Sequence, residues 1–186
     1  MARRRWQYPF AFAKHRIRWG LHVKKTLILG IGNVLLSDDG AGVHAARSLA
    51  TRLVRRDAVQ VLDGGTLSFT LAPMIAGAQR LIILDATQLD GPPGEIRTFI
   101  GEEVDRLLGR PRLTVHEIGL RDVLDVVRLS GDLPSERALI GIQPGSLAWG
   151  TELTPAVAGV LESVVARAAD LLDRWPAESA LAMQAA

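Results

Sequence analysis

The chain of 186 residues contains no cysteine, and this absence excludes several classes of protein at once. Without thiols there can be no disulfide scaffold, no thiolate zinc site and no cysteine nucleophile. No run approaches 18 uninterrupted apolar residues, so a membrane-spanning helix is excluded as well. Hydrophobic residues make up 48% of the sequence, enough to bury a core. We therefore expect a soluble globular protein with one main domain.

The net charge of +2 hides an uneven distribution of charged residues. Residues 1–25 carry eight basic and no acidic side chains, which leaves 14 basic against 20 acidic residues for the rest. Nucleic-acid binding would rest on that segment alone, so none is expected. Its short apolar run, interrupted by Pro9, fits neither a secretory nor a twin-arginine signal. We expect a cytoplasmic location.

Three parts are predicted along the chain. Residues 1–25 form a basic N-terminal extension that is disordered or lies upstream of the true start. Residues 26–176 form a single α/β domain, and residues 177–186 form a frayed tail. Pro176 marks the end of the last expected helix.

Strand and helix patterns alternate from residue 26 onward. Continuous apolar runs predict buried strands at 26–30, 59–62, 80–85 and 138–142, and residues 95–100 alternate as an edge strand does. Helical spacing covers 42–55, 69–78, 102–108, a segment just after His116, and 154–176, where Thr154 is the expected cap. The pattern predicts an α/β fold with three layers, in which helices cover both faces of a mostly parallel sheet.

Polar groups follow the ends of three predicted strands, where ligands gather in such sheets. The first strand leads into Gly30-Ile31-Gly32 and then Ser37-Asp38-Asp39-Gly40, the second ends in Asp63-Gly64-Gly65, and the third ends in Asp85. A dinucleotide fingerprint would require glycine at position 35, which is leucine, and two aspartates would repel a pyrophosphate. Dinucleotide binding is therefore disfavoured.

Two carboxylates and one imidazole suit a divalent ion such as nickel, zinc or manganese. Asp39, Asp85 and His116 could supply them and leave a coordination position open. Each residue also has an ordinary interpretation. Asp39 could cap the following helix, Asp85 could bind loop amides, and His116 could simply open a helix. Spacing alone leaves both interpretations open.

Other catalytic patterns are poor. The sequence has no His-Glu-x-x-His and no Gly-x-Ser-x-Gly motif. Ser146 is interpreted as a loop residue, and His44 as a surface or packing histidine.

Five blocks in order carry a family resemblance. They are LILGIGNVLLSDDGAGV (27–43), LDGGT (62–66), LIILDA (81–86), HEIGL (116–120) and GIQP (141–144). Together they resemble the hydrogenase maturation endopeptidases, which remove the C-terminal extension from the large subunit of nickel–iron hydrogenases. The similarity runs from about residue 23 to residue 175, and its first block is the most specific.

The resemblance implies a five-stranded twisted sheet between helices, and a site assignment. Asp39, Asp85 and His116 match the metal-contacting positions, and Asp63 matches a position implicated in activity or substrate recognition. The resemblance then implies that the metal is nickel supplied by the substrate, so that the site checks whether nickel has been inserted. No tightly held resident ion is expected, although other divalent ions can occupy the site in vitro. The expected partner is the large-subunit precursor, and the expected state is a monomer.

Two mechanisms are compatible with these residues. In one, nickel or its bound water acts on the scissile carbonyl, with Asp63 or Asp38 as the catalytic base. In the other, an aspartate activates water and the metal only positions the tail. The alternative functions are a non-catalytic, chaperone-like binding module of the same fold and a small-molecule hydrolase.

Substrate contacts are expected on the loops at the strand ends. The loops at 85–94 and 143–152 could wall a groove for a protein tail. Leu147, Trp149 and Leu153 are candidates for gripping the client, although Trp149 could instead pack over the last helix.

Overall fold

A computed structural model of the chain describes residues 26–53, 58–66, 69–110 and 115–175, with the backbone alone at 115–118. The predicted extension over 1–25 and the predicted tail over 177–186 lie outside the described residues. In the described part of the chain, no helix is long and apolar enough to cross a membrane. The cytoplasmic location and the monomeric state stay predictions.

Five strands form one sheet in the order β2-β1-β3-β5-β4. They are β1 (Thr26–Ile31), β2 (Val59–Gly65), β3 (Arg80–Ala86), β4 (Ile96–Ile100) and β5 (Glu136–Ile142). All neighbouring pairs are parallel except β4 and β5, which are antiparallel at one edge. The predicted mostly parallel five-stranded sheet is confirmed.

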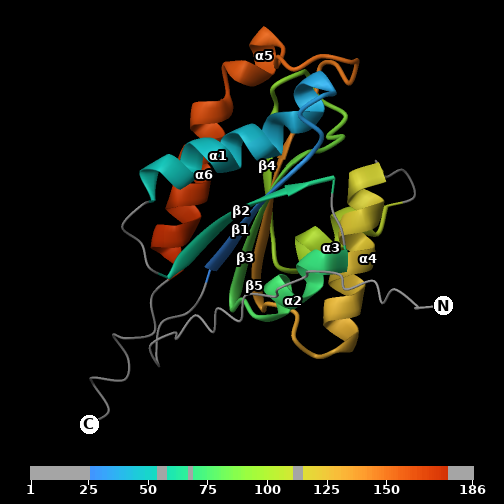
Figure 1. The fold of residues 1–186 in the computed structure, drawn as a ribbon, viewed down its shortest axis with the longest axis vertical. Coiled ribbons are helices and arrows are strands. Elements are labelled where there is room, and N and C mark those ends of the chain that lie inside the picture. The colour runs from blue at the N-terminus through green and yellow to red at the C-terminus, as the bar shows by residue number, and fades with distance from the viewer. Residues whose placement is uncertain (1–25, 54–57, 67–68, 111–114, 176–186) are drawn as a thin grey trace, which may run out of the picture.

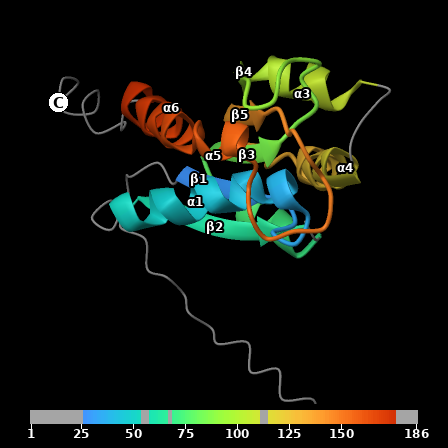
Figure 2. The same ribbon diagram turned by 90° about the horizontal axis from the view of Figure 1, so that it is seen from above.

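Helices cover both faces of this sheet and complete the three predicted layers. The α-helices are α1 (Ala41–Arg52), α2 (Ala72–Ala76), α3 (Glu102–Leu108), α4 (Val115–Leu129), α5 (Pro155–Ala158) and α6 (Leu161–Arg174). Two 3₁₀ turns, η1 (Ser37–Gly40) and η2 (Phe69–Leu71), precede α1 and α2. Figures 1 and 2 show α1 and α6 on one face, with α2, α3 and α4 on the other.

The two-residue period of the central strands divides the core into two halves. In β1, Ile28 packs with α1 and α6, whereas Leu27 and Leu29 pack with α2, α3 and α4. Side chains alternate because successive Cβ atoms point to opposite faces of a sheet. Every residue of β1 and β3 is buried, as expected for strands covered on both faces.

Two local predictions near the rim were wrong. The helix predicted from Thr154 is broken, since α5 ends at Ala158 with Gly159 as its C-cap and α6 begins at Leu161. Glycine favours such an interruption because it loses the most backbone freedom in a helix. The Thr154 side chain makes no capping bond. His116 lies in the first turn of α4, at the start of a helix as the sequence predicts.

Gly42 allows α1 to sit directly on the ends of β1 and β3. A Cβ atom there would lie 2.1 Å from the carbonyl oxygen of Leu84 and 2.5 Å from that of Ile31. Neither strand oxygen can move without breaking the sheet, so Gly42→Ala is expected to lower the free energy of unfolding by about 3 kcal/mol. Urea denaturation measures this change. Gly77→Ala is the control, because its Cβ would lie 3.3 Å from the nearest atom, at an exposed helix end. An unchanged stability in Gly42→Ala would contradict the packing described.

Candidate active site

The sheet has a topological switch point between β1 and β3. The chain leaves β1 through α1 to β2 on one side, then crosses through α2 to β3 on the other side of β1. Ligands of open α/β sheets bind at such a point, beyond the carboxyl ends of the strands. This rim lies at the top of Figure 1, and Figure 2 looks down on it.

Asp39 lies at this switch point, in η1, and is 6% exposed. Its Oδ2 accepts a hydrogen bond of 2.9 Å from the backbone N–H of Asn33, across the turn that follows β1. Gly32, at φ +134°, allows that turn to close, since a Cβ there would lie 1.8 Å from the carbonyl oxygen of Asp39. The N-cap position of α1 is held by Gly40 and not by Asp39. The interpretation of Asp39 as a helix cap was therefore wrong.

Asp85 and Asp63 face opposite sides of the sheet. Leu84 packs into the core under α1 and α6, so Asp85, the next residue of β3, points toward the layer of α2, α3 and α4. Asp63 is the register partner of Gly30, and a Cβ at Gly30 would touch Ala46 of α1, so Asp63 points toward α1. One strand separates their strands, which places them about 10 Å apart. The two carboxylates therefore lie on different sides of the rim.

His116 opens α4, which covers the face toward which Asp85 points. In Figure 1, α4 begins on the rim side of the molecule. The His116 side chain lies outside the described part of the structure. The described side chains contain no group of three His, Cys, Asp or Glu residues that could hold a metal ion. The metal set of Asp39, Asp85 and His116 therefore stays a prediction.

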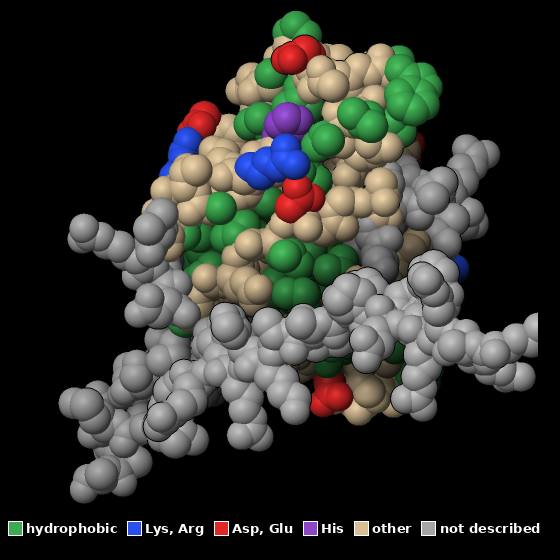
Figure 3. Space-filling view, in the orientation of Figure 1, with side chains coloured by type: hydrophobic (Ala, Val, Ile, Leu, Met, Phe, Trp, Pro, Cys, Tyr) green, Lys and Arg blue, Asp and Glu red, His purple; other side chains and the backbone are tan. Residues whose placement is uncertain are grey.

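Arg47 of α1 holds the Asp63 carboxylate. Oδ2 of Asp63 accepts bonds from Nε (3.2 Å) and Nη2 (2.8 Å) of Arg47, while Oδ1 accepts one from the N–H of Gly65 (3.0 Å). Both side chains are about half exposed. In Figure 3, basic and acidic side chains meet on this face beside a histidine. No signal in the sequence linked Arg47 to Asp63.

Asp38, the second predicted catalytic residue, is fully buried and holds a distant loop in place. Its Oδ2 accepts bonds from the N–H groups of Gly145 (2.8 Å) and Ser146 (3.0 Å) and from the hydroxyl of Thr154 (2.8 Å). Its Oδ1 accepts the N–H of Thr154 at 2.7 Å. This explains why the Thr154 hydroxyl does not cap α5. Four donors around one carboxylate favour a structural role.

The same contacts govern the pKa of Asp38. Burial by itself raises the pKa of this carboxyl, but the bonds donated by Thr154, Gly145 and Ser146 together outweigh it and hold the pKa below its ordinary value. The group is therefore ionised at neutral pH, and its negative charge strengthens each of these hydrogen bonds.

Backbone bonds join the two loops that Asp38 connects. The N–H of Ser37 donates to the carbonyl of Gly150 (2.8 Å), the N–H of Gly150 donates to the carbonyl of Leu35 (3.0 Å), and the Ser37 hydroxyl donates to the carbonyl of Ala148 (3.0 Å). The Ser146 hydroxyl accepts a hydrogen bond from the backbone N–H of Ala148 (3.3 Å), as expected for a loop residue. These bonds join the paired loops into one hydrogen-bonded segment beside Asp39.

Three apolar side chains are exposed on these paired loops, namely Leu35 (51%), Leu147 (50%) and Trp149 (83%). We call them the rim patch. The interpretation that Trp149 packs over the last helix was therefore wrong. Leu153 is partly buried against the core under α1 and α6, so it is unsuited to gripping a client.

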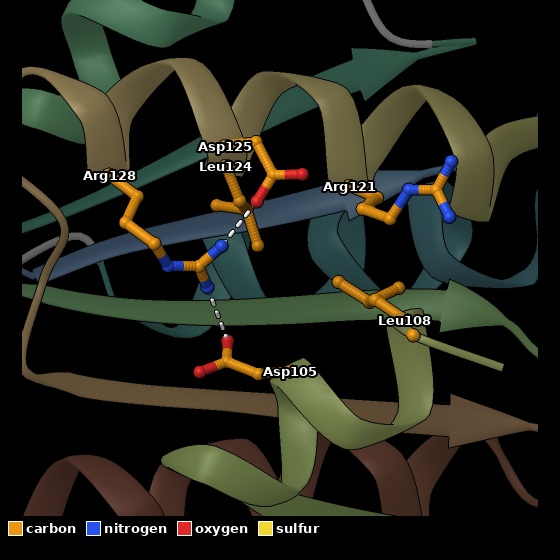
Figure 4. A pocket seen from close by; sticks show the side chains of 7 residues that line it. Asp105, Leu108, Arg121, Leu124, Asp125 and Arg128 are labelled. Carbon is orange, nitrogen blue, oxygen red and sulfur yellow. Dashed lines mark hydrogen bonds and ion pairs between the residues drawn. The ribbon is translucent and has the colours of Figure 1, made fainter.

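A cavity of about 230 Å³ lies between α3 and α4 (Figure 4). Arg128 crosses it and pairs with both Asp105 and Asp125. Because Arg128 already pairs with both acidic side chains of the lining, we assign this cavity to helix packing.

Comparisons with known proteins agree with this architecture. The hydrogenase maturation protease family (HycI) matches residues 43–171. A hydrogenase expression/formation protein, HupD of Rhodobacter capsulatus, is 36% identical over 156 residues, covering 83% of this chain and 74% of that protein. The hydrogenase 2 maturation protease of Escherichia coli K12 is 37% identical, covering 74% of this chain and 84% of that protein.

Solved structures give the same result. The hydrogenase maturating endopeptidase HybD from E. coli has a TM-score of 0.76 at 35% identity, covering 81% of this chain and 94% of that one. The [NiFe] hydrogenase maturation protease HybD from Thermococcus kodakarensis has a TM-score of 0.69 at 35% identity, covering 79% and 98%. The family resemblance and the expected class of enzyme are both confirmed. The chain belongs to the hydrogenase maturation protease family and is an endopeptidase.

Proposed function

We propose that this endopeptidase removes the C-terminal extension of a nickel–iron hydrogenase large-subunit precursor after nickel has been inserted. The observation that carries the proposal is the position of Asp39 and Asp85 at the switch point of a hydrogenase maturation protease fold. Two carboxylates at that point suit a cation carried by an incoming protein.

Nickel is here part of the substrate. Asp39, Asp85 and His116 contact the nickel of the precursor and thereby test whether it has been loaded. Carboxylate and imidazole ligands without a thiolate bind a borderline ion reversibly, so the enzyme can release its product. A fully buried Asp85 supports this role, because a buried carboxylate gains most from a neighbouring cation.

Asp63 acts on the peptide rather than on the metal. It faces α1, whereas Asp85 faces the opposite layer, which supports the mechanism in which an aspartate activates water and the metal positions the tail. Asp63 accepts a proton from the attacking water, whose oxygen adds to the scissile carbonyl, and the proton passes to the departing amine. Asp38 takes no part in proton transfer in this proposal.

The rim patch provides the grip on the client. Leu35, Leu147 and Trp149 are exposed beside Asp39, on loops that Asp38 holds rigid. An apolar contact there orients the precursor without adding charge near the nickel.

The test uses the full chain and a large-subunit precursor prepared with and without nickel, with mass analysis of the precursor's C-terminus. We expect loss of a C-terminal peptide only from the nickel-loaded form, and no loss with His116→Ala. Cleavage of both forms would support the protease activity but contradict the proposal that the enzyme tests for nickel. Stable binding without any cut would favour the chaperone-like module instead.

A further inference from the structure

We propose that Arg47 is a positioning residue that leaves one oxygen of Asp63, Oδ1, as the working oxygen of the site. This inference rests on the proposed function of Asp63. It adds a residue that the sequence motifs do not contain, and it assigns different tasks to the two carboxylate oxygens.

The assignment follows from the number of hydrogen bonds that each oxygen accepts. A carboxylate offers about four acceptor positions, two on each oxygen. Oδ2 of Asp63 accepts from Nε and Nη2 of Arg47, at 3.2 and 2.8 Å, and is filled. Oδ1 accepts only the N–H of Gly65, at 3.0 Å, among the described residues. One acceptor position on Oδ1 therefore remains for water or a peptide N–H.

Arg47 also ties the Asp63 carboxylate to α1, the helix that follows Asp39 in the chain. It projects from α1, the helix that begins two residues after Asp39 and whose second residue, Gly42, packs on the ends of β1 and β3. Asp63 lies at the end of β2, an edge strand with a neighbour on one side only. Arg47 therefore orients the Asp63 carboxylate relative to α1, the helix that begins two residues after Asp39.

Arginine is suited to this task and lysine is not. Two donors of a planar guanidinium fix both the distance and the direction of the oxygen that they bind, whereas an ammonium group supplies charge without a fixed direction. The pair is half exposed, so it adds little to stability. Because the Arg47–Asp63 pair adds little to the stability of the fold, a role in orienting Asp63 explains why it is present.

Three variants test the inference: Arg47→Ala, Arg47→Lys, and the control Arg52→Ala. Arg52 lies on the same helix, at its last residue, and forms an exposed ion pair with Glu162 of α6 at 2.6 Å rather than with Asp63. Steady-state cleavage of the nickel-loaded precursor gives kcat and KM for each, and thermal melting monitors the fold.

We expect Arg47→Ala to lower kcat by about 10–100-fold, because a misplaced catalytic group costs this much, with KM changed less than about threefold. Arg47→Lys should restore little of the loss, since it returns the charge but not the two-point contact. Arg52→Ala should behave as the wild type. All three should melt within about 3 °C of the wild type.

A double-mutant cycle separates this inference from the proposed function. Added to Asp63→Asn, Arg47→Ala should cause no further loss of kcat, because it acts only through Asp63. Full activity of Arg47→Ala beside an inactive Asp63→Asn would overturn the role of Arg47 and leave Asp63 in place. A wild-type kcat in Arg47→Lys would show that Arg47 supplies only a positive charge, and would contradict its role in orienting Asp63. Full activity of Asp63→Asn would reject the proposed function itself.

Discussion

Replacing Asp63 by asparagine is expected to lower kcat for precursor cleavage by about 10²–10⁴-fold, the range that a positioned general base contributes. Asparagine keeps the shape of the side chain and can still accept a bond from the N–H of Gly65, but it cannot take a proton from water. Precursor binding should persist, because Asp39, Asp85 and the rim patch are untouched. Rates from C-terminal mass analysis, together with a pull-down of the nickel-loaded precursor, measure both quantities.

The fold of this variant should survive. The ion pair that it removes is half exposed and contributes about 1 kcal/mol or less to the free energy of unfolding. Asp122→Asn is a suitable control, since Asp122 is an exposed aspartate near an arginine, Arg121, on α4. Turnover at the wild-type rate in Asp63→Asn would remove Asp63 from the mechanism.

The second large effect concerns Asp38. We expect Asp38→Asn to lower the free energy of unfolding by about 2–4 kcal/mol, because an amide group would face the buried N–H donors that the carboxylate now accepts. Amide hydrogen exchange at Gly145, Ser146 and Thr154 should become faster. Activity should fall as well, since the loop that carries Leu147 and Trp149 loses its anchor.

The effect of Asp38 depends on pH in a definite direction. Its pKa is lower in the folded protein than its ordinary value of 3.8. The stability that it contributes is therefore fully present above that value and is lost as the pH falls through the lowered folded pKa. The difference in unfolding free energy between wild type and Asp38→Asn should be constant near neutral pH and shrink below about pH 4.

Two further variants serve as a partial change and as a control for Asp38→Asn. Thr154→Val removes only the hydroxyl bond to Oδ2 of Asp38 and should cost about 1 kcal/mol. Asp170→Asn, at an exposed position of α6, should cost almost nothing. Unchanged exchange at the loop amides in Asp38→Asn would contradict the structural role of this carboxylate, whatever its activity.

Most of the fold could be predicted from the sequence because its signals are local. The runs at 26–30 and 80–85 are apolar at nearly every position, which occurs in strands covered on both faces, and the structure contains them as β1 and β3. Their alternation with amphipathic helices favours parallel strands. Because such strands end at one rim, the order of motifs was enough to place Asp39, Asp63 and Asp85 there.

The break between α5 and α6 could not be predicted in the same way. Its apolar stripe continues through the break, since Val157 and Val164 both reach the core under α1 and α6. The periodic pattern therefore predicts one continuous helix. The only local sign of the break is Gly159, whose preference against helix is weak. The hydrogen bond from the Thr154 hydroxyl to Asp38 could not be predicted either, because the two residues are 116 positions apart in the sequence.

By itself, the sequence determined the fold class, the family resemblance and the set of acidic residues at the rim. Tertiary structure alone decided the burial and the hydrogen-bond partners of each carboxylate. Asp38 and Asp63 are the same residue type, one just after β1 and the other at the end of the neighbouring β2. Yet Asp38 is buried among four donors, and Asp63 is held half exposed by Arg47. The reason is physical: hydrogen-bond partners and solvent access, which set the chemistry of a carboxylate, come from segments far apart in the chain and meet only when it folds.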